Sequence, residues 1–158
     1  MPLVDQNGRP VRETWQATDI PPATGHNLLL PFQVARDMSP TELTRIAPIG
    51  LRVDGNTAFD QIVPILAYVG MVVISFPSFR DGRGFTLATT LRRHGFSGEL
   101  RASGSILPDQ LAALRQCGFS SIETPPAHPP AQWQAAASSF SEARPLLKHL
   151  LAQQSSVK

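Results

Sequence analysis

Two short stretches rich in arginine, glycine and serine carry the side chains of this sequence that are best suited to bind an anion. The first, Arg80–Gly84 (Arg-Asp-Gly-Arg-Gly), follows an apolar run that ends at Phe76. Glycine lets the backbone approach a ligand closely or take a positive φ, and guanidinium groups match the geometry of oxyanions. A strand that ends in such a turn before a helix is a common ligand site in parallel α/β proteins. We therefore predict a small-anion or phosphate site here; the alternative is an ordinary loop in which Asp81 caps the helix and the arginines are solvated.

The second stretch, Arg101–Ser105, ends the next predicted strand. Sequential strands are neighbours roughly two-thirds of the time, so we expect the two stretches to form one site for phosphate, sulfate, sulfite or carboxylate. The predicted anion-binding residues are Arg80, Asp81, Gly82, Arg83, Gly84, Arg101, Ser103, Gly104 and Ser105. Their glycine spacing matches neither a P-loop nor a dinucleotide-binding turn. For Arg101 the alternative is an ion pair with Glu99, which lies on the same face of the strand.

Other reactive side chains form no recognisable catalytic pattern. The four histidines are isolated and lack metal-ligand spacing, so we expect no metal site. The single cysteine, Cys117, lies on the apolar stripe of a predicted helix, which favours a buried structural role. We find no Ser-His-Asp arrangement and no paired-carboxylate motif. Whether the protein is an enzyme stays open, and its cofactor, if it has one, is unknown.

Alternating strand and helix patterns must position the candidate residues. Five short apolar runs predict strands, and apolar residues at helical spacing separate them. The predicted strands cover residues 27–32, 49–53, 71–76, 98–102 and 119–123. Short connections favour parallel pairing, so we expect a single α/β domain with a mainly parallel five-stranded sheet and flanking helices. We predict an open doubly wound sheet; the alternative is half of a (β/α) barrel that pairs with a second copy as a homodimer.

Both ends of the chain fall outside this alternation. Residues 3–15 predict an N-terminal β-hairpin, because Asn7-Gly8 between apolar residues favours a type I′ turn. We expect residues 1–25 to form a hairpin and loop packed on an α/β domain of residues 26–143. Residues 144–158 are the expected C-terminal extension, with leucines at spacing that favours a short amphipathic segment.

Local signals predict where three helices begin, break or end. Ser39-Pro40-Thr41-Glu42 is a capping-box pattern with proline at the first helical position. Pro64 interrupts an otherwise helical pattern, so we expect a break there. His94-Gly95 predicts the end of the helix that follows Asp81.

Composition narrows the class of protein. A chain of 158 residues with 42% hydrophobic content is expected to form one domain with a sizeable core. It contains no run of 18 apolar residues and no charged-then-apolar leader, so we expect a soluble cytoplasmic protein that neither spans a membrane nor is exported. The net charge of +2 and the scattered arginines argue against a nucleic-acid partner.

Four sequence motifs together resemble a known family. They are Phe76–Phe85, Gly98–Gly104, Asp109–Leu111 and Cys117–Phe119. The family is a small uncharacterised bacterial one whose members are typically encoded beside assimilatory sulfite reductase. Its members are often labelled as probable oxidoreductases or accessory proteins of sulfite reduction. Those labels come from gene neighbourhood, so the resemblance implies a context and no catalytic residues.

Three hypotheses about function follow from the residues and the resemblance. The first is an accessory protein of assimilatory sulfite or sulfate reduction that binds a small oxyanion at the carboxyl edge of the sheet. The second is an oxidoreductase component of sulfite reduction that relies on a cofactor held by a partner. The third is a non-catalytic interaction module that docks on sulfite reductase or on a second copy.

Overall fold

Parallel strands joined by helices make up most of residues 2–139, the part of the chain that the computed structural model describes. The strands are β1 (Leu3–Asp5), β2 (Gln16–Ala17), β3 (Leu28–Pro31), β4 (Ile49–Asp54), β5 (Val69–Phe76), β6 (Glu99–Gly104) and β7 (Ser121–Glu123). The helices are α1 (Phe32–Arg36), α2 (Pro40–Ile46), α3 (Phe59–Ile62), α4 (Arg83–Arg93) and α5 (Leu111–Gln116), with 3₁₀ segments η1 (Val63–Tyr68) and η2 (Pro108–Gln110). Residues 130–139 are also helical. The expected C-terminal extension, residues 144–158, lies outside the described residues.

The strands form one sheet in the order β1-β7-β6-β5-β4-β3-β2. Neighbours from β2 to β7 are parallel, and β1 pairs antiparallel with β7. The predicted α/β class is confirmed, and β5 lies at the centre. The predicted five-stranded sheet is wrong, because the sheet has seven strands of mixed direction. The two further strands lie at the edges: β1 falls in the expected N-terminal hairpin but joins the main sheet, and β2, with two residues, is too short to show an apolar pattern in the sequence.

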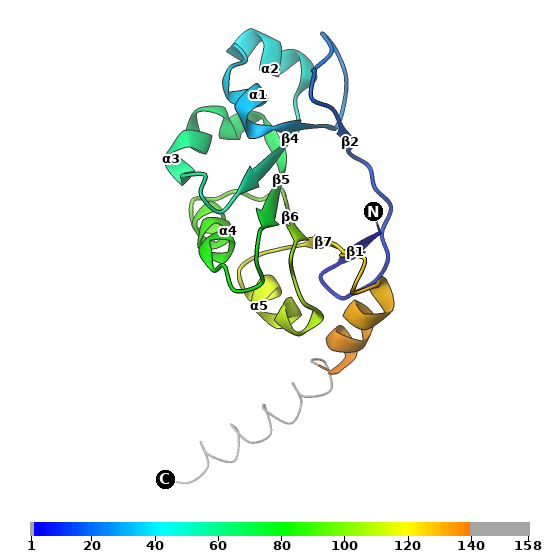
Figure 1. The fold of residues 1–158 in the computed structure, drawn as a ribbon. Coiled ribbons are helices and arrows are strands. Elements are labelled where there is room, and N and C mark those ends of the chain that lie inside the picture. The colour runs from blue at the N-terminus through cyan, green and yellow to red at the C-terminus, as the bar shows by residue number, and fades with distance from the viewer. Residues whose placement is uncertain (1, 140–158) are drawn as a thin grey trace, which may run out of the picture.

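The helices cover one face of this sheet, so the predicted doubly wound arrangement is wrong. From β2 to β7 the parallel strands follow one another in chain order, and right-handed crossovers then place every connecting helix on the same side. Figure 1 shows α1–α5 along that side and the N-terminal segment along the other. One large apolar cluster joins the helices to alternate residues of the strands. This strand order agrees with the half-barrel alternative; pairing with a second copy stays a prediction.

The N-terminal segment joins the two edges of the sheet. Its first arm, β1, lies beside β7, and residues 16–17 lie beside β3 at the opposite edge. The turn after β1 is a three-residue loop ending in Gly8, at φ 76°, and Asn7 lacks the positive φ of a type I′ turn. Beyond a single bridge at Pro10, the expected second arm does not pair as a strand. Residues 9–15, which we call the strap, instead cross the face of the sheet that the connecting helices leave uncovered. We call this face the open face.

The local signals for helix ends are confirmed. Ser39 Oγ accepts a hydrogen bond from the Glu42 N–H, and the Glu42 carboxylate accepts one from the Ser39 N–H. The break expected at Pro64 appears as a change from α3 to the 3₁₀ segment η1. Helix α4 ends at His94 with Gly95 at φ 90°, where the Phe96 N–H bonds to the Leu91 carbonyl.

Helix α4 lies close to β5 because Gly84 has no side chain. A Cβ at Gly84 would lie 2.5 Å from Cε1 of Phe76 and 3.1 Å from Cγ2 of Ile74. The Phe76 ring cannot retreat easily, since it packs against the rings of Phe85 and Phe119 at centroid distances of 5.1 and 5.9 Å. At Gly82, by contrast, a Cβ would meet nothing within 4 Å.

We predict that Gly84→Ala lowers the free energy of unfolding by about 1–3 kcal/mol, the usual cost of overpacking a core. Gly82→Ala, two residues away in the same turn, is the matched control and should stay within about 0.5 kcal/mol of the parent. Urea unfolding of the three proteins measures both. Equal midpoints for the two variants would contradict this account of the turn.

Candidate functional site

A buried arginine lies at the centre of the open face of the sheet. The side chain of Arg101 on β6 is 1% exposed. Its Nη1 and Nη2 donate to the two carboxylate oxygens of Glu13 at 2.6 and 3.1 Å, and Nη2 also donates to Glu99 at 2.8 Å. Nε donates to the hydroxyl of Ser121 at 3.4 Å. All three guanidinium nitrogens therefore have protein partners.

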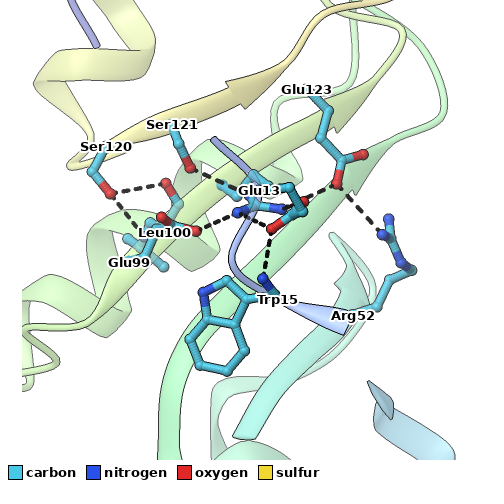
Figure 2. Close-up of polar contacts among 9 residues, drawn as sticks. Glu13, Trp15, Arg52, Glu99, Leu100, Ser120, Ser121 and Glu123 are labelled. Carbon is cyan, nitrogen blue, oxygen red and sulfur yellow. Dashed lines mark hydrogen bonds and ion pairs between the residues drawn. The ribbon is translucent and has the colours of Figure 1, made fainter. Parts of the chain in front are cut away.

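A second ion pair joins this cluster from β4 and β7. One oxygen of the Glu123 carboxylate, Oε1, lies 3.5 Å from Nη2 of Arg52 and 3.6 Å from Nη1 of Arg101. Figure 2 shows Glu13, Glu99 and Glu123 converging from the strap, β6 and β7, with Arg52 reaching in from β4. Three carboxylates face two guanidiniums, so the cluster carries one net negative charge.

The ion pairs shift the pKa values of the groups they join. Burial disfavours the charged form of Arg101, but hydrogen bonds and charge from Glu13 and Glu99 outweigh it, so the pKa of Arg101 is raised. Burial raises the pKa of Glu13, but hydrogen bonds from Arg101 and the Trp15 N–H outweigh that, so its pKa is lowered overall. Both shifts favour the charged pair, which ties the strap to the sheet.

Residues on the open face form three rows across the sheet. The row at the amino end contains Leu29, Gly50, Met71 and Glu99, and the ring of Trp15 from the strap packs on it. The middle row contains Pro31, Arg52, Val73, Arg101 and Ser121. The row at the carboxyl end runs from Asp54 through Ser75 and Ser103 to Glu123. The strap covers the first two rows, and the third is wholly polar.

Within the Arg80–Gly84 turn, Asp81 and Arg83 pair with each other. Oδ1 of Asp81 accepts hydrogen bonds from the Arg83 N–H at 3.0 Å and from Arg83 Nε at 2.9 Å. Arg83 also donates to the amide oxygen of Asn56. Hydrogen bonds from the Arg83 side chain and N–H hold the pKa of Asp81 down at about 2. The carboxylate of Asp81 thus occupies the start of α4, where an external anion would bind.

The two predicted stretches are neighbours, as expected from sequential pairing. Ser75 and Ser103 face each other on β5 and β6 with their hydroxyl oxygens 3.2 Å apart. The Ser105 N–H donates to the Phe76 carbonyl at 2.8 Å. Gly104 takes φ 92°, and a Cβ there would lie 2.4 Å from the Phe76 carbonyl oxygen, so only glycine allows this close approach.

A pocket of about 420 Å³ opens at the carboxyl ends of β6 and β7. It lies between the turn after β5, the turn after β6 and the proline-rich loop after β7. Its lining residues are Phe79, Gly104, Ser105, Ile106, Leu107, Glu123, Pro125, Pro126, Ala127 and His128. The walls are mainly apolar, with a carboxylate, a hydroxyl and an imidazole among them. Its volume and lining are typical of a small-molecule site.

The structure separates the predicted anion-binding residues into three places. Gly104 and Ser105 line the pocket, and Ser103 lies beneath the carboxyl edge with 4% exposure. Arg80 lies beside the pocket, with its guanidinium carbon 5.4 Å from the centre of the Phe79 ring. Asp81–Gly84 form the cap of α4, and Arg101 lies in the ion-pair cluster. An anion site that includes all of them stays a prediction.

Sequence reasoning missed four polar residues of this region. Alternation along β4 and β7 could have placed Arg52 and Glu123 on the same face as Arg101, because side chains repeat with period two. Nothing local indicates that Glu13 reaches Arg101, since 88 residues separate them. His128 joins the pocket only because the loop after β7 folds back over the turn after β6.

The fold and the site together define a singly wound α/β protein with a strapped open face and a pocket at its carboxyl edge. The chain belongs to a family described as bacterial protein of unknown function (DUF934), whose model matches residues 50–144. No curated protein matches the chain. Among the described residues, no helix has the length and apolar character needed to cross a membrane. Residues 2–139 also contain no group of three or more histidine, cysteine or acidic side chains arranged to hold a metal ion.

We predict that Arg101→Met lowers the free energy of unfolding by about 3–5 kcal/mol, because it leaves the carboxylates around it without their shared partner. Glu13→Gln should cost at most about 1 kcal/mol, because Glu13 is half exposed and its amide can still accept a hydrogen bond. Urea unfolding at neutral pH compares the two. An Arg101→Met protein as stable as the parent would show that the cluster is not a structural centre.

Proposed function

We propose that this protein is an accessory component of sulfite or sulfate reduction that binds a small oxyanion, or a molecule carrying one, at the carboxyl edge of its sheet. The observation that carries the proposal is the pocket at the ends of β6 and β7, which the predicted residues Gly104 and Ser105 help to line. Open α/β sheets commonly bind ligands at this edge. The sulfur context rests on the family resemblance of the motifs around residues 76–119.

Arg80 is the cation best placed to meet such an anion. Arg83 is paired with Asp81, Arg101 with Glu13 and Glu99, and Arg52 with Glu123. Arg80 is exposed and has no acidic partner among residues 2–139; it lies against Phe79 at the side of the pocket. The hydroxyl of Ser105, on the pocket wall, supplies a further donor. The proposed oxyanion site is therefore Arg80 with Ser105.

Calorimetric titration with sulfite, sulfate and phosphate tests the oxyanion site. We expect at least one of the three to bind, and Arg80→Ala to weaken that binding at least tenfold. Arg93→Ala is the matched control, because Arg93 is also exposed but lies at the opposite end of α4. Absence of binding to all three anions, or equal binding by the parent and Arg80→Ala, overturns the site.

A separate experiment tests the accessory role. The tagged full-length chain should retain sulfite reductase from a bacterial lysate in a pull-down, and the purified pair should co-elute on gel filtration. Phe79→Glu should weaken the complex if the partner contacts the Phe79 ring, which lies on the pocket wall and is 45% exposed. Val63→Glu, at an exposed apolar residue on η1, is the control. Failure of the purified proteins to co-elute rejects the accessory role and leaves the oxyanion site standing.

A further inference from the structure

We propose that the pocket at the carboxyl ends of β6 and β7 binds a small aromatic molecule that carries positively charged N–H donors. This inference deepens the proposed function, because it concerns the same edge of the sheet, and it names the chemistry of the part of the ligand that enters the pocket. Three features point to this chemistry: the pocket walls, the second carboxylate oxygen of Glu123, and the net charge of the ion-pair cluster to which Glu123 belongs.

The walls select an apolar, flat group. Phe79 and Leu107 lie on the pocket wall together with the proline-rich loop, Pro125 to Ala127. Proline and aromatic side chains present rigid surfaces, so a ring gains buried apolar contact there with little loss of side-chain entropy. A volume of about 420 Å³ exceeds what a single ring needs and lies within the usual range for small-molecule sites.

The polar groups on the wall are mainly acceptors. Glu123 is 11% exposed, and both of its ion pairs engage the same oxygen, Oε1. Its second oxygen, Oε2, has no hydrogen-bond partner among the described residues and is not fully buried, and Glu123 lines the pocket. In the neutral ring, Nδ1 of His128 donates to Gln132 at 2.7 Å, which leaves Nε2 as an acceptor. A ligand that offers N–H groups satisfies these acceptors, and one that offers only oxygen acceptors does not.

Charge favours a cation over a neutral donor. Glu13, Glu99 and Glu123 outnumber Arg52 and Arg101 by one, so the cluster that Glu123 belongs to retains a net negative charge. Glu123 is the member of this cluster that lines the pocket. A monovalent cation hydrogen-bonded to Oε2 neutralises that charge in a partly buried position, where charge-assisted bonds are strongest. A cationic ring that also carries an oxyanion substituent offers a donor to Glu123 and an acceptor to Arg80.

Benzamidine, benzamide and benzoate test this inference as probes of one shape. They present, respectively, charged donors, neutral donors and acceptors only. Two-dimensional NMR of the full-length protein offers a local reporter, because the indole N–H of Trp133 donates to the carbonyl of His128 at 2.9 Å. Trp15, the other tryptophan, packs at the amino end of the sheet and serves as an internal reference. We expect benzamidine to shift the Trp133 signal, and to bind at least tenfold more tightly than benzoate.

Two variants separate recognition from folding. Glu123→Gln should reduce the preference for benzamidine over benzoate to less than threefold. Because that change also breaks ion pairs to Arg52 and Arg101, Ser105→Trp provides a second test: it fills the pocket from an exposed turn without removing a charge. Ser105→Trp should abolish benzamidine binding, whereas the control Val63→Trp, on the helical side, should keep it.

The outcomes distinguish this inference from the proposed function. Equal or tighter binding of benzoate, absence of benzamidine binding, or benzamidine binding that survives Ser105→Trp overturns the cationic-ring pocket. If the parent protein still binds sulfite or phosphate, and Arg80→Ala weakens that binding, the oxyanion site stands. If benzamidine shifts the Trp133 signal and none of the oxyanions binds, the cationic-ring pocket is supported. In that case only the oxyanion site is rejected.

Discussion

The contact between Glu13 and Arg101 is the constraint on which the arrangement of the open face depends. A guanidinium that is 1% exposed requires partners for its donors, and two of its nitrogens bond to a carboxylate that comes from outside the sheet. That contact holds the strap across the middle of the sheet. The ring of Trp15 then covers Met71 and Val73, residues that would otherwise face water. A sheet with helices on one face alone thereby buries part of its second face.

The position of the strap also decides where a ligand can bind. It covers the amino-end and middle rows of the open face and leaves the carboxyl-end row, which contains Asp54 and Glu123. Glu123 belongs to both regions: one carboxylate oxygen is held by the ion-pair cluster, and the residue also lines the pocket. The ion-pair cluster around Arg101 therefore orients Glu123, which is also part of the candidate pocket. Carboxyl-edge sites in other parallel α/β proteins similarly combine a rigid sheet with variable loops.

The Arg80–Gly84 turn shows how a motif that resembles an anion site can serve the fold. Asp81 accepts the hydrogen bond from the Arg83 N–H at the start of α4 and also holds the Arg83 side chain. Gly84 allows α4 to approach Phe76 closely. Most of the turn thus caps and packs a helix. Arg80, which has no acidic partner among the described residues, is the part of the motif that remains available to a ligand.

The sequence by itself determined the features that depend on neighbouring residues: the Ser39 capping box, the break at Pro64, the glycine stop after α4, the five parallel strands β3 to β7 and the pairing of Arg101 with Glu99. Only the tertiary structure decided that the helices share one face, that Glu13 completes the Arg101 cluster, and that His128 and Phe79 line one pocket. The reason is physical. Capping and side-chain alternation act over a few residues, whereas these contacts require strand order and loop paths that bring distant segments together, and no local pattern encodes either.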